Sequence, residues 1–124
     1  MMYLGIDWGT KRIGLALGDS ETKIATPFKI ARDIDEIKKI IKDEEVDKII
    51  IGEPLKMQNS ELKTQDEFLK FLESLKKEIK IPIIKVDERL SSKGADALVG
   101  NKKTKASRDA IAAMLILQSY FDKI

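Results

Sequence analysis

The chain has 124 residues, 43% of them hydrophobic and 35% charged, which is the size and composition of one globular domain with one core. Its 23 Lys and Arg residues nearly balance 21 Asp and Glu residues, so a nucleic-acid-binding surface has to come from local clustering of basic side chains. The chain contains no Cys and no His, which excludes disulfides, thiol catalysis, Ser–His catalysis and His-ligated zinc. No apolar run approaches membrane-spanning length and no secretion signal opens the chain, so we expect a cytoplasmic protein that does not engage a membrane.

Three strand-like segments come first. Residues 3–7 and 12–19 are apolar runs joined by the short turn "WGTK", and residues 24–31 form a third run. Their close spacing along the chain predicts antiparallel pairing. Pro27 cannot donate a ladder hydrogen bond, which favours a sheet edge or a strand end for the third segment.

Helices and strands alternate through the rest of the chain. The apolar spacing predicts helices over residues 33–45, 61–79 and 107–121, and β-branched runs predict strands over residues 48–54 and 81–89. Strands separated by helices pair in parallel through right-handed crossovers. We therefore predict a three-layer α/β domain with a mixed five-stranded sheet, whose first three strands are antiparallel, and with helices on both faces.

Three acidic residues stand at the ends of predicted elements. Asp7 ends the first strand, Glu88 ends the last strand, and Asp109 lies in the first turn of the last helix. Carboxylates brought together repel one another unless they are protonated or bridged by a cation. Oxygen ligands without His or Cys favour Mg²⁺ or Mn²⁺, and two such ions about 4 Å apart can hydrolyse phosphodiesters. The three acids therefore predict a metal-dependent phosphodiesterase.

Each of these acids also has a purely structural interpretation. Asp7 could hold a glycine-rich turn. Glu88 could pair with Arg89, and Asp109 could favour the positive amino end of its helix. Any one of the three alone is weak evidence, and it is their combination on a sheet of this order that favours a metal site.

Small residues and one aromatic residue surround Asp7. Gly5 and Gly9 are expected to leave room for ions and for a phosphate backbone, and Gly9 also to permit the turn. Trp8 could stack on a nucleobase, but a partly buried packing role is the expected one.

Four blocks of the sequence resemble the YqgF/RuvX family: "GIDWGTKRIGLALGD", "GEPLKM", "VDERLSSKGA" and "RDAIAAMLILQSYF". They span nearly the whole chain, and their combination is specific. The resemblance implies an RNase H-like fold over residues 1–124 as a single nuclease domain. It implies an endonuclease of the RuvC-type superfamily that processes the 5′ end of pre-16S rRNA, with some members linked to Holliday-junction resolution. By the same resemblance, Asp7, Glu88 and Asp109 match the catalytic and metal-binding acids.

Sites of the RuvC type generally gather four acids, and only three are clear here. Glu53 and Asp87 are the candidates for a fourth. Alternation along the last strand is expected to point Asp87 and Glu88 to opposite faces, so that only one of the two reaches the metals.

Basic residues cluster near two of the acids. In this position they are candidates for phosphate contacts with salt-dependent affinity, although a run of charges is also typical of a solvated face. Arg12, which matches the family's motif arginine, has a salt bridge to a nearby acid as its alternative role. The candidates are Lys11, Arg12, Lys102, Lys103, Lys105 and Arg108.

Three competing functions fit parts of the pattern. The "DWGT" turn also resembles the phosphate loop of actin-like and sugar-kinase ATPases. Those proteins enclose a nucleotide between two lobes, whereas the length of this chain supplies only one lobe. A non-catalytic nucleic-acid-binding module would not need all three acids. The same nuclease chemistry could act on four-way DNA junctions, because metals and phosphates are alike for both substrates. No dimer-forming stripe stands out, so we expect a monomer rather than a homodimer.

Overall fold

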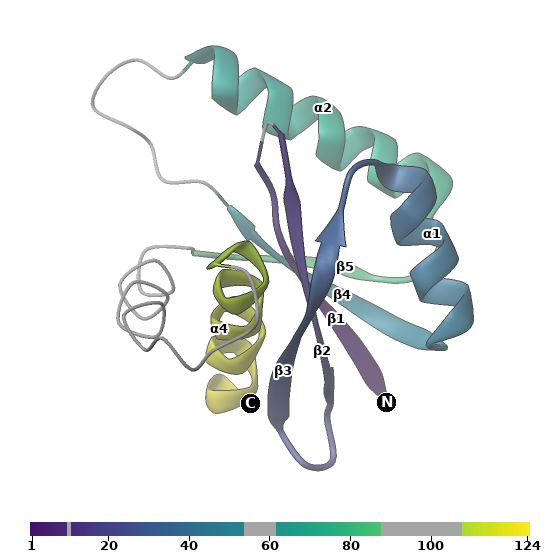
Figure 1. Cartoon of the computed structure of the whole chain (residues 1–124), viewed down its shortest axis with the longest axis vertical. Coiled ribbons are helices and arrows are strands. Elements are labelled where there is room, and N and C mark those ends of the chain that lie inside the picture. Colours follow the sequence, from purple (N-terminus) through teal and green to yellow (C-terminus); the bar gives the residue numbers. More distant parts are fainter. Residues whose placement is uncertain (10, 54–61, 88–107) are drawn as a thin grey trace.

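The computed structural model describes residues 1–9, 11–53, 62–87 and 108–124. Five strands and three helices lie in these ranges (Figure 1). They are β1 (Met2–Asp7), β2 (Ile13–Asp19), β3 (Ile24–Ala31), α1 (Ile34–Asp43), β4 (Val46–Glu53), α2 (Leu62–Glu78), β5 (Ile83–Asp87) and α4 (Arg108–Lys123). None of the helices in the described ranges is long and apolar enough to cross a membrane.

The strands form one mixed sheet in the order β3-β2-β1-β4-β5. β1 pairs antiparallel with β2, and β2 pairs antiparallel with β3. β4 lies parallel to β1, and β5 lies parallel to β4. The predicted five-stranded sheet with an antiparallel beginning is therefore confirmed, and β1 is its central strand.

The strand that contains Pro27 is at one edge of the sheet, as its sequence predicts. Pro27 pairs with Ala16 of β2, and the register between the two strands shifts between Leu15 and Ala16. A proline and an irregular register both weaken an edge strand as a template for pairing with another chain.

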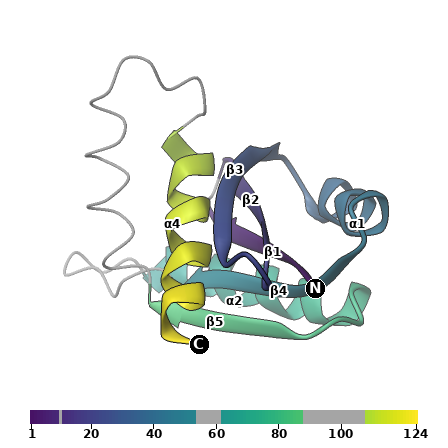
Figure 2. The same cartoon turned by 90° about the horizontal axis from the view of Figure 1, so that it is seen from below.

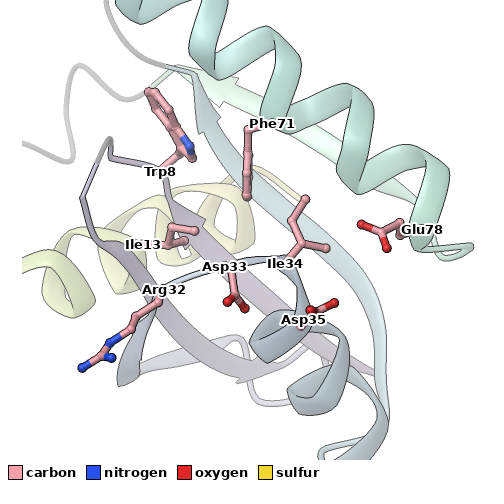
Figure 3. A pocket seen from close by; sticks show the side chains of 8 residues that line it. All are labelled: Trp8, Ile13, Arg32, Asp33, Ile34, Asp35, Phe71 and Glu78. Carbon is pink, nitrogen blue, oxygen red and sulfur yellow. The ribbon is translucent and has the colours of Figure 1, made fainter.

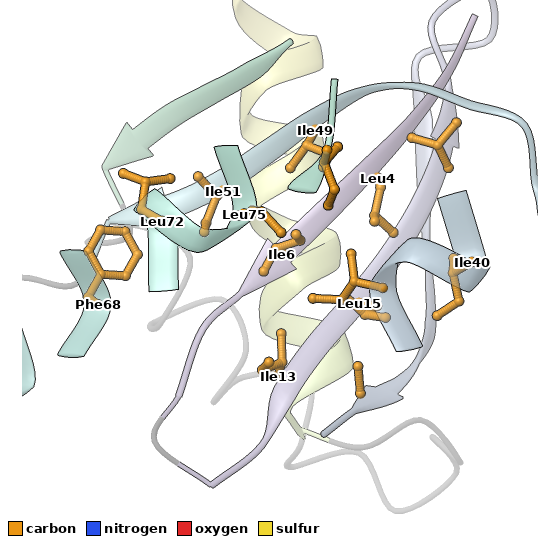
Figure 4. Packing of buried hydrophobic residues seen from close by; sticks show 14 residues of the cluster. Leu4, Ile6, Ile13, Leu15, Ile40, Ile49, Ile51, Phe68, Leu72 and Leu75 are labelled. Atoms are coloured by element: carbon orange, nitrogen blue, oxygen red, sulfur yellow. The ribbon is translucent and has the colours of Figure 1, made fainter. Parts of the chain in front are cut away.

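Helices cover both faces of the sheet, and each face has its own apolar cluster (Figure 2). On the face covered by α1 and α2, Leu4 and Ile6 of β1 pack with residues of both helices, among them Ile40 and Leu75 (Figure 4). On the other face, α4 packs against β1, β3 and β4 through a smaller cluster of Tyr3, Ala25, Ile50, Ile116, Leu117 and Phe121. Successive residues of β1 thus serve different layers, which is the period-two pattern of a strand buried on both sides.

Local signals set the limits of α1. Asp33 is its N-cap, and one carboxylate oxygen of Asp33 accepts a hydrogen bond of 3.0 Å from the backbone N–H of Glu36. Ile37 and Ile40 then face the sheet one turn apart and are buried.

The last helix is buried along most of its length, as its nearly continuous apolar sequence predicts. It runs from Arg108 to Lys123, so its first turn includes Asp109. The position of this turn against the sheet determines where the Asp109 carboxylate lies.

Candidate active site

Asp7 is the last residue of the central strand, on the face that α4 covers. Leu4 and Ile6 belong to the cluster under α1 and α2, whereas Tyr3 belongs to the cluster under α4. Because side chains alternate along a strand, Gly5 and Asp7 share the face of Tyr3. Asp7 is partly buried there.

Glycines occupy the ladder positions on both sides of Asp7. Asp7 pairs with Gly14 of the antiparallel neighbour β2 and with Gly52 of the parallel neighbour β4. Side chains that are directly opposite each other normally crowd together across a sheet. The carboxylate of Asp7 therefore has no side chain beside it in either neighbouring strand at its own level.

Asp109 lies next to this row of residues. An added Cβ on Gly14 would overlap the carbonyl carbon and oxygen of Asp109 and lie 3.0 Å from the backbone nitrogen of Ala110. The first turn of α4 therefore rests directly on Gly14. In an antiparallel pair such as Gly14 and Asp7, the two Cα atoms are about 4.5–5.5 Å apart. The structure brings together Asp7 and Asp109, which are 102 positions apart in the chain.

The two glycines beside Asp7 in the chain do not play the same role. Gly5 was expected to leave room for ions, and this expectation is wrong. An added Cβ on Gly5 would lie 2.8 Å from the carbonyl oxygen of Ala113 and 2.9 Å from Cβ of Leu117, so α4 already fills that space. Gly9 does serve the turn, since a Cβ there would lie 2.7 Å from the carbonyl oxygen of Arg12.

Arg12 lies beside the acids and faces solvent. Its Nε is 3.9 Å from one carboxylate oxygen of Asp109, and the side chains are 71% and 37% exposed. An ion pair this exposed and this long stabilises the fold little. Lys11, in the same turn, and Arg108, at the start of α4, are also exposed. Of the six predicted basic residues, Arg12 thus pairs with Asp109, and Arg108 directly precedes it in the chain.

Glu53, one of the two candidates for a fourth acid, does not share the face of Asp7. Glu53 follows Gly52, the ladder partner of Asp7, so alternation places Glu53 on the opposite face. Its carboxylate is exposed and lies 4.0 Å from Nζ of Lys85. Asp87 occupies the β5 position in register with Glu53.

Four predicted site residues lie outside the described residues: Glu88, Lys102, Lys103 and Lys105. Within the described residues, no three acidic side chains gather as a complete set of metal ligands. Asp7 and Asp109 are thus the part of the predicted acidic site whose geometry is defined.

Trp8 points away from the acids, toward the face that α1 and α2 cover. Its ring lies 5.6 Å from the ring of Phe68 in an edge-on arrangement and 6.2 Å from the ring of Phe71. The partly buried packing role expected for Trp8 is confirmed.

An open pocket of about 500 Å³ lies beside Trp8 and Phe71 (Figure 3). Sequence reasoning missed it, because it forms between α2 and the junction of β3 with α1. Three carboxylates and one guanidinium line its rim, from Asp33, Asp35, Glu78 and Arg32. An acidic rim on the face opposite Asp7 makes this pocket a poor place for the phosphates of a nucleic acid.

Two kinds of solved protein share this fold. The structure of Thermus thermophilus RuvC in complex with a Holliday junction substrate superposes with a TM-score of 0.70 at 15% identity, over 99% of this chain and 95% of that chain. The Holliday junction resolvase of fowlpox virus superposes with a TM-score of 0.62 at 11% identity, over the full length of both chains. These similarities confirm the predicted RNase H-like architecture.

Similarity at the level of sequence is closer. A protein of Natranaerobius thermophilus is 38% identical over 99% of this chain and 95% of its own length. A protein of Maridesulfovibrio salexigens is 37% identical over 97% of both chains. Each carries the name "Putative pre-16S rRNA nuclease". The model of the RuvX family, described as Holliday junction resolvase, matches residues 1–123, and the chain belongs to this family.

Proposed function

We propose that this protein is a metal-dependent endonuclease that hydrolyses phosphodiester bonds in structured nucleic acid, and that the 5′ end of pre-16S rRNA is its substrate. The observation that carries the proposal is the meeting of Asp7 and Asp109 across Gly14, at the end of the central strand. Relatives named as pre-16S rRNA nucleases support the choice of substrate.

The donor set fits a hard divalent cation. Asp7 and Asp109 offer only carboxylate oxygens, and the chain has no His or Cys to compete for a softer metal. The ladder partners of Asp7 in both neighbouring strands are glycines, so no side chain of β2 or β4 covers this carboxylate at its own level of the sheet. We propose that Asp7, Glu88 and Asp109 would hold Mg²⁺ or Mn²⁺, and that a bound pair of such ions would supply an activated water and charge stabilisation of the leaving oxygen.

The residues of the chain itself would orient the substrate. Two neighbouring carboxylates create a negative region that would repel a phosphodiester in the absence of cations. The guanidinium of Arg12, 3.9 Å from Asp109, offsets part of this charge and is free on its solvent side to contact a phosphate oxygen. We propose the same contact role for Lys11 and Arg108, and for the three predicted lysines at positions 102, 103 and 105.

Branched DNA is the second candidate substrate, because the family description and the RuvC complex both refer to Holliday junctions. Phosphate contacts position either substrate without distinguishing them. We further propose that residues 1–124 act as one nuclease domain, as a monomer, in the cytoplasm.

The test compares three proteins on two substrates. Wild type, Asp7→Asn and Glu78→Gln are incubated with Mg²⁺ or Mn²⁺ and either pre-16S rRNA 5′ ends or four-way DNA junctions. Glu78 is a matched control, since it is a carboxylate on the opposite face that pairs with Lys38 at 3.5 Å. Loss of one metal ligand is expected to slow cleavage at least about a hundredfold in Asp7→Asn, whereas Glu78→Gln retains activity.

The pattern of cleavage decides between the functions. Cleavage of the rRNA but not of the junction supports the main proposal, and the reverse assigns branched DNA as the substrate. Equal cleavage by wild type and Asp7→Asn would remove Asp7 from the mechanism. If wild type binds both substrates and cleaves neither, the protein is a non-catalytic binding module.

A further inference from the structure

We propose that Gly14 is a positioning residue that sets the separation of Asp7 and Asp109. The inference rests on the proposed function of this site and adds a residue with no functional group of its own. Gly14 is the ladder partner of one acid and the packing surface for the backbone of the other. Its missing side chain therefore defines how closely strand β1 and helix α4 bring the two carboxylates together.

Gly14 belongs to a row of three close contacts between the sheet and α4, which we call the glycine track: Gly5, Gly14 and Gly18. Gly14 contacts α4 at Asp109, Gly5 contacts it at Ala113 and Leu117, and Gly18 contacts it at Leu117 and Phe121. These helix residues recur every four positions and lie along one side of α4. The helix thus rests on the strand backbones from its first turn, at the level of Asp7, to its last turn, where the ring of Phe121 lies 5.5 Å from the ring of Tyr3.

Backbone conformation does not require the glycines of the track. No glycine in the described part of the chain has a positive φ, so other residue types could adopt these backbone angles. The requirement is instead the space for α4. At Gly18 an added Cβ would meet side-chain carbon atoms of Phe121 and Leu117, at 2.6 and 3.1 Å, and the carbonyl oxygen of Ile24 at 2.9 Å.

Gly14 is packed more closely against α4 than either of the other two glycines. The atoms nearest to it on α4 are all backbone atoms, of Asp109 and Ala110, which cannot rotate out of the way. A methyl group at Gly14 can be accommodated only if the first turn of α4 moves away from β2, by on the order of 1 Å for an ordinary van der Waals contact. Such a shift moves Asp109 away from Asp7, and misplacement by this amount costs about a hundredfold in rate.

The first test measures proximity directly. The chain has no Cys, so an Asp7→Cys/Asp109→Cys pair provides the only thiols. A disulfide needs Cα atoms within about 7 Å, which makes its rate of formation in oxidised glutathione sensitive to a shift of α4. Gly14→Ala, Gly5→Ala and Gly18→Ala are each added to this pair, and folding is checked by circular dichroism.

We expect disulfide formation to be fastest with Gly18→Ala, slower with Gly5→Ala and slowest with Gly14→Ala. Relative to the Cys pair alone, the rate should change less than twofold with Gly18→Ala and decrease at least about tenfold with Gly14→Ala. Gly18→Ala is the matched control, because it crowds the same helix at the end distant from the acids. Equal rates in all three variants would overturn the proposal. If Gly14→Ala does not fold, the comparison of Gly5→Ala with Gly18→Ala decides in the same way.

The second test uses the native acids. Calorimetry measures Mn²⁺ affinity, and steady-state kinetics separates kcat from KM. We expect Gly14→Ala to lower Mn²⁺ affinity and kcat while KM stays within about twofold, because phosphate contacts such as Arg12 are retained. Gly18→Ala is expected to lower only the melting temperature. A kcat that falls equally in both variants would assign Gly14 a purely structural role.

A longer side chain should restore part of the lost reach. Asp109→Glu is expected to lower activity in wild type and to raise it in Gly14→Ala, a coupling that general destabilisation does not produce. The disulfide rates need no metal and no substrate, so they test the position of Gly14 even if wild type cleaves neither nucleic acid. Failure of cleavage alone would refute the proposed function and leave the positioning role to be decided by those rates.

Discussion

Replacing Arg12 with Gln separates a phosphate contact from a structural salt bridge. The pair with Asp109 is 3.9 Å long, with side chains 71% and 37% exposed. Exposed pairs contribute about 0–1 kcal/mol, so the free energy of unfolding is expected to fall by less than about 1 kcal/mol. The guanidinium is nevertheless next to the proposed metal ligands, where the scissile phosphate would lie.

The expected change is in binding to nucleic acid. Each phosphate contact contributes about 0.9 to the slope of log affinity against log salt concentration for a duplex, and about 0.7 for a single strand. Arg12→Gln is therefore expected to reduce that slope by nearly one unit and to weaken binding most at low salt. Fluorescence anisotropy with a labelled RNA, titrated from about 50 to 300 mM NaCl in the Asp7→Asn background, measures it.

Arg32→Gln is the matched control for this experiment. Arg32 is also an exposed arginine near carboxylates, but it lines the acidic pocket on the face of α1 and α2. Its substitution is expected to leave the salt slope unchanged. An unchanged slope for Arg12→Gln, together with a loss of more than about 2 kcal/mol in unfolding free energy, would refute the reasoning and make Arg12 a structural residue.

Two further predictions concern packing and metal binding. Trp8→Ala removes two aromatic contacts of a partly buried ring and is expected to lower the unfolding free energy by about 2–3 kcal/mol. Trp8→Phe is expected to lower it by about half as much. Urea denaturation measures both losses, and equal losses in the two variants would contradict the packing role. Mn²⁺ at a hundred times its dissociation constant is expected to stabilise the fold by about 2.7 kcal/mol, which raises the melting temperature by several degrees in wild type but not in Asp7→Asn. The same rise in both proteins would place the bound ion elsewhere.

The sequence by itself determined the elements and their order. Apolar spacing is a local property, and it predicted every strand and helix that the structure describes. Pro27 favoured a sheet edge or a strand end for its strand, and the structure has this strand at the edge. It also selected Asp7 and Asp109 as acids at element ends, because each lies next to a clear change of pattern. The resemblance of four sequence blocks then led to the RuvX family, which the family match confirms.

Only the tertiary structure decided which of these residues meet. Strand register placed glycines on both sides of Asp7 and put Glu53 on the other face of the sheet, one position past the ladder partner of Asp7. The docking of α4 filled the space beside Gly5 and brought Asp109 onto Gly14. Strand register and helix docking depend on contacts between segments that are tens of residues apart in the chain. No local sequence pattern therefore encodes the distance at which α4 packs against the sheet.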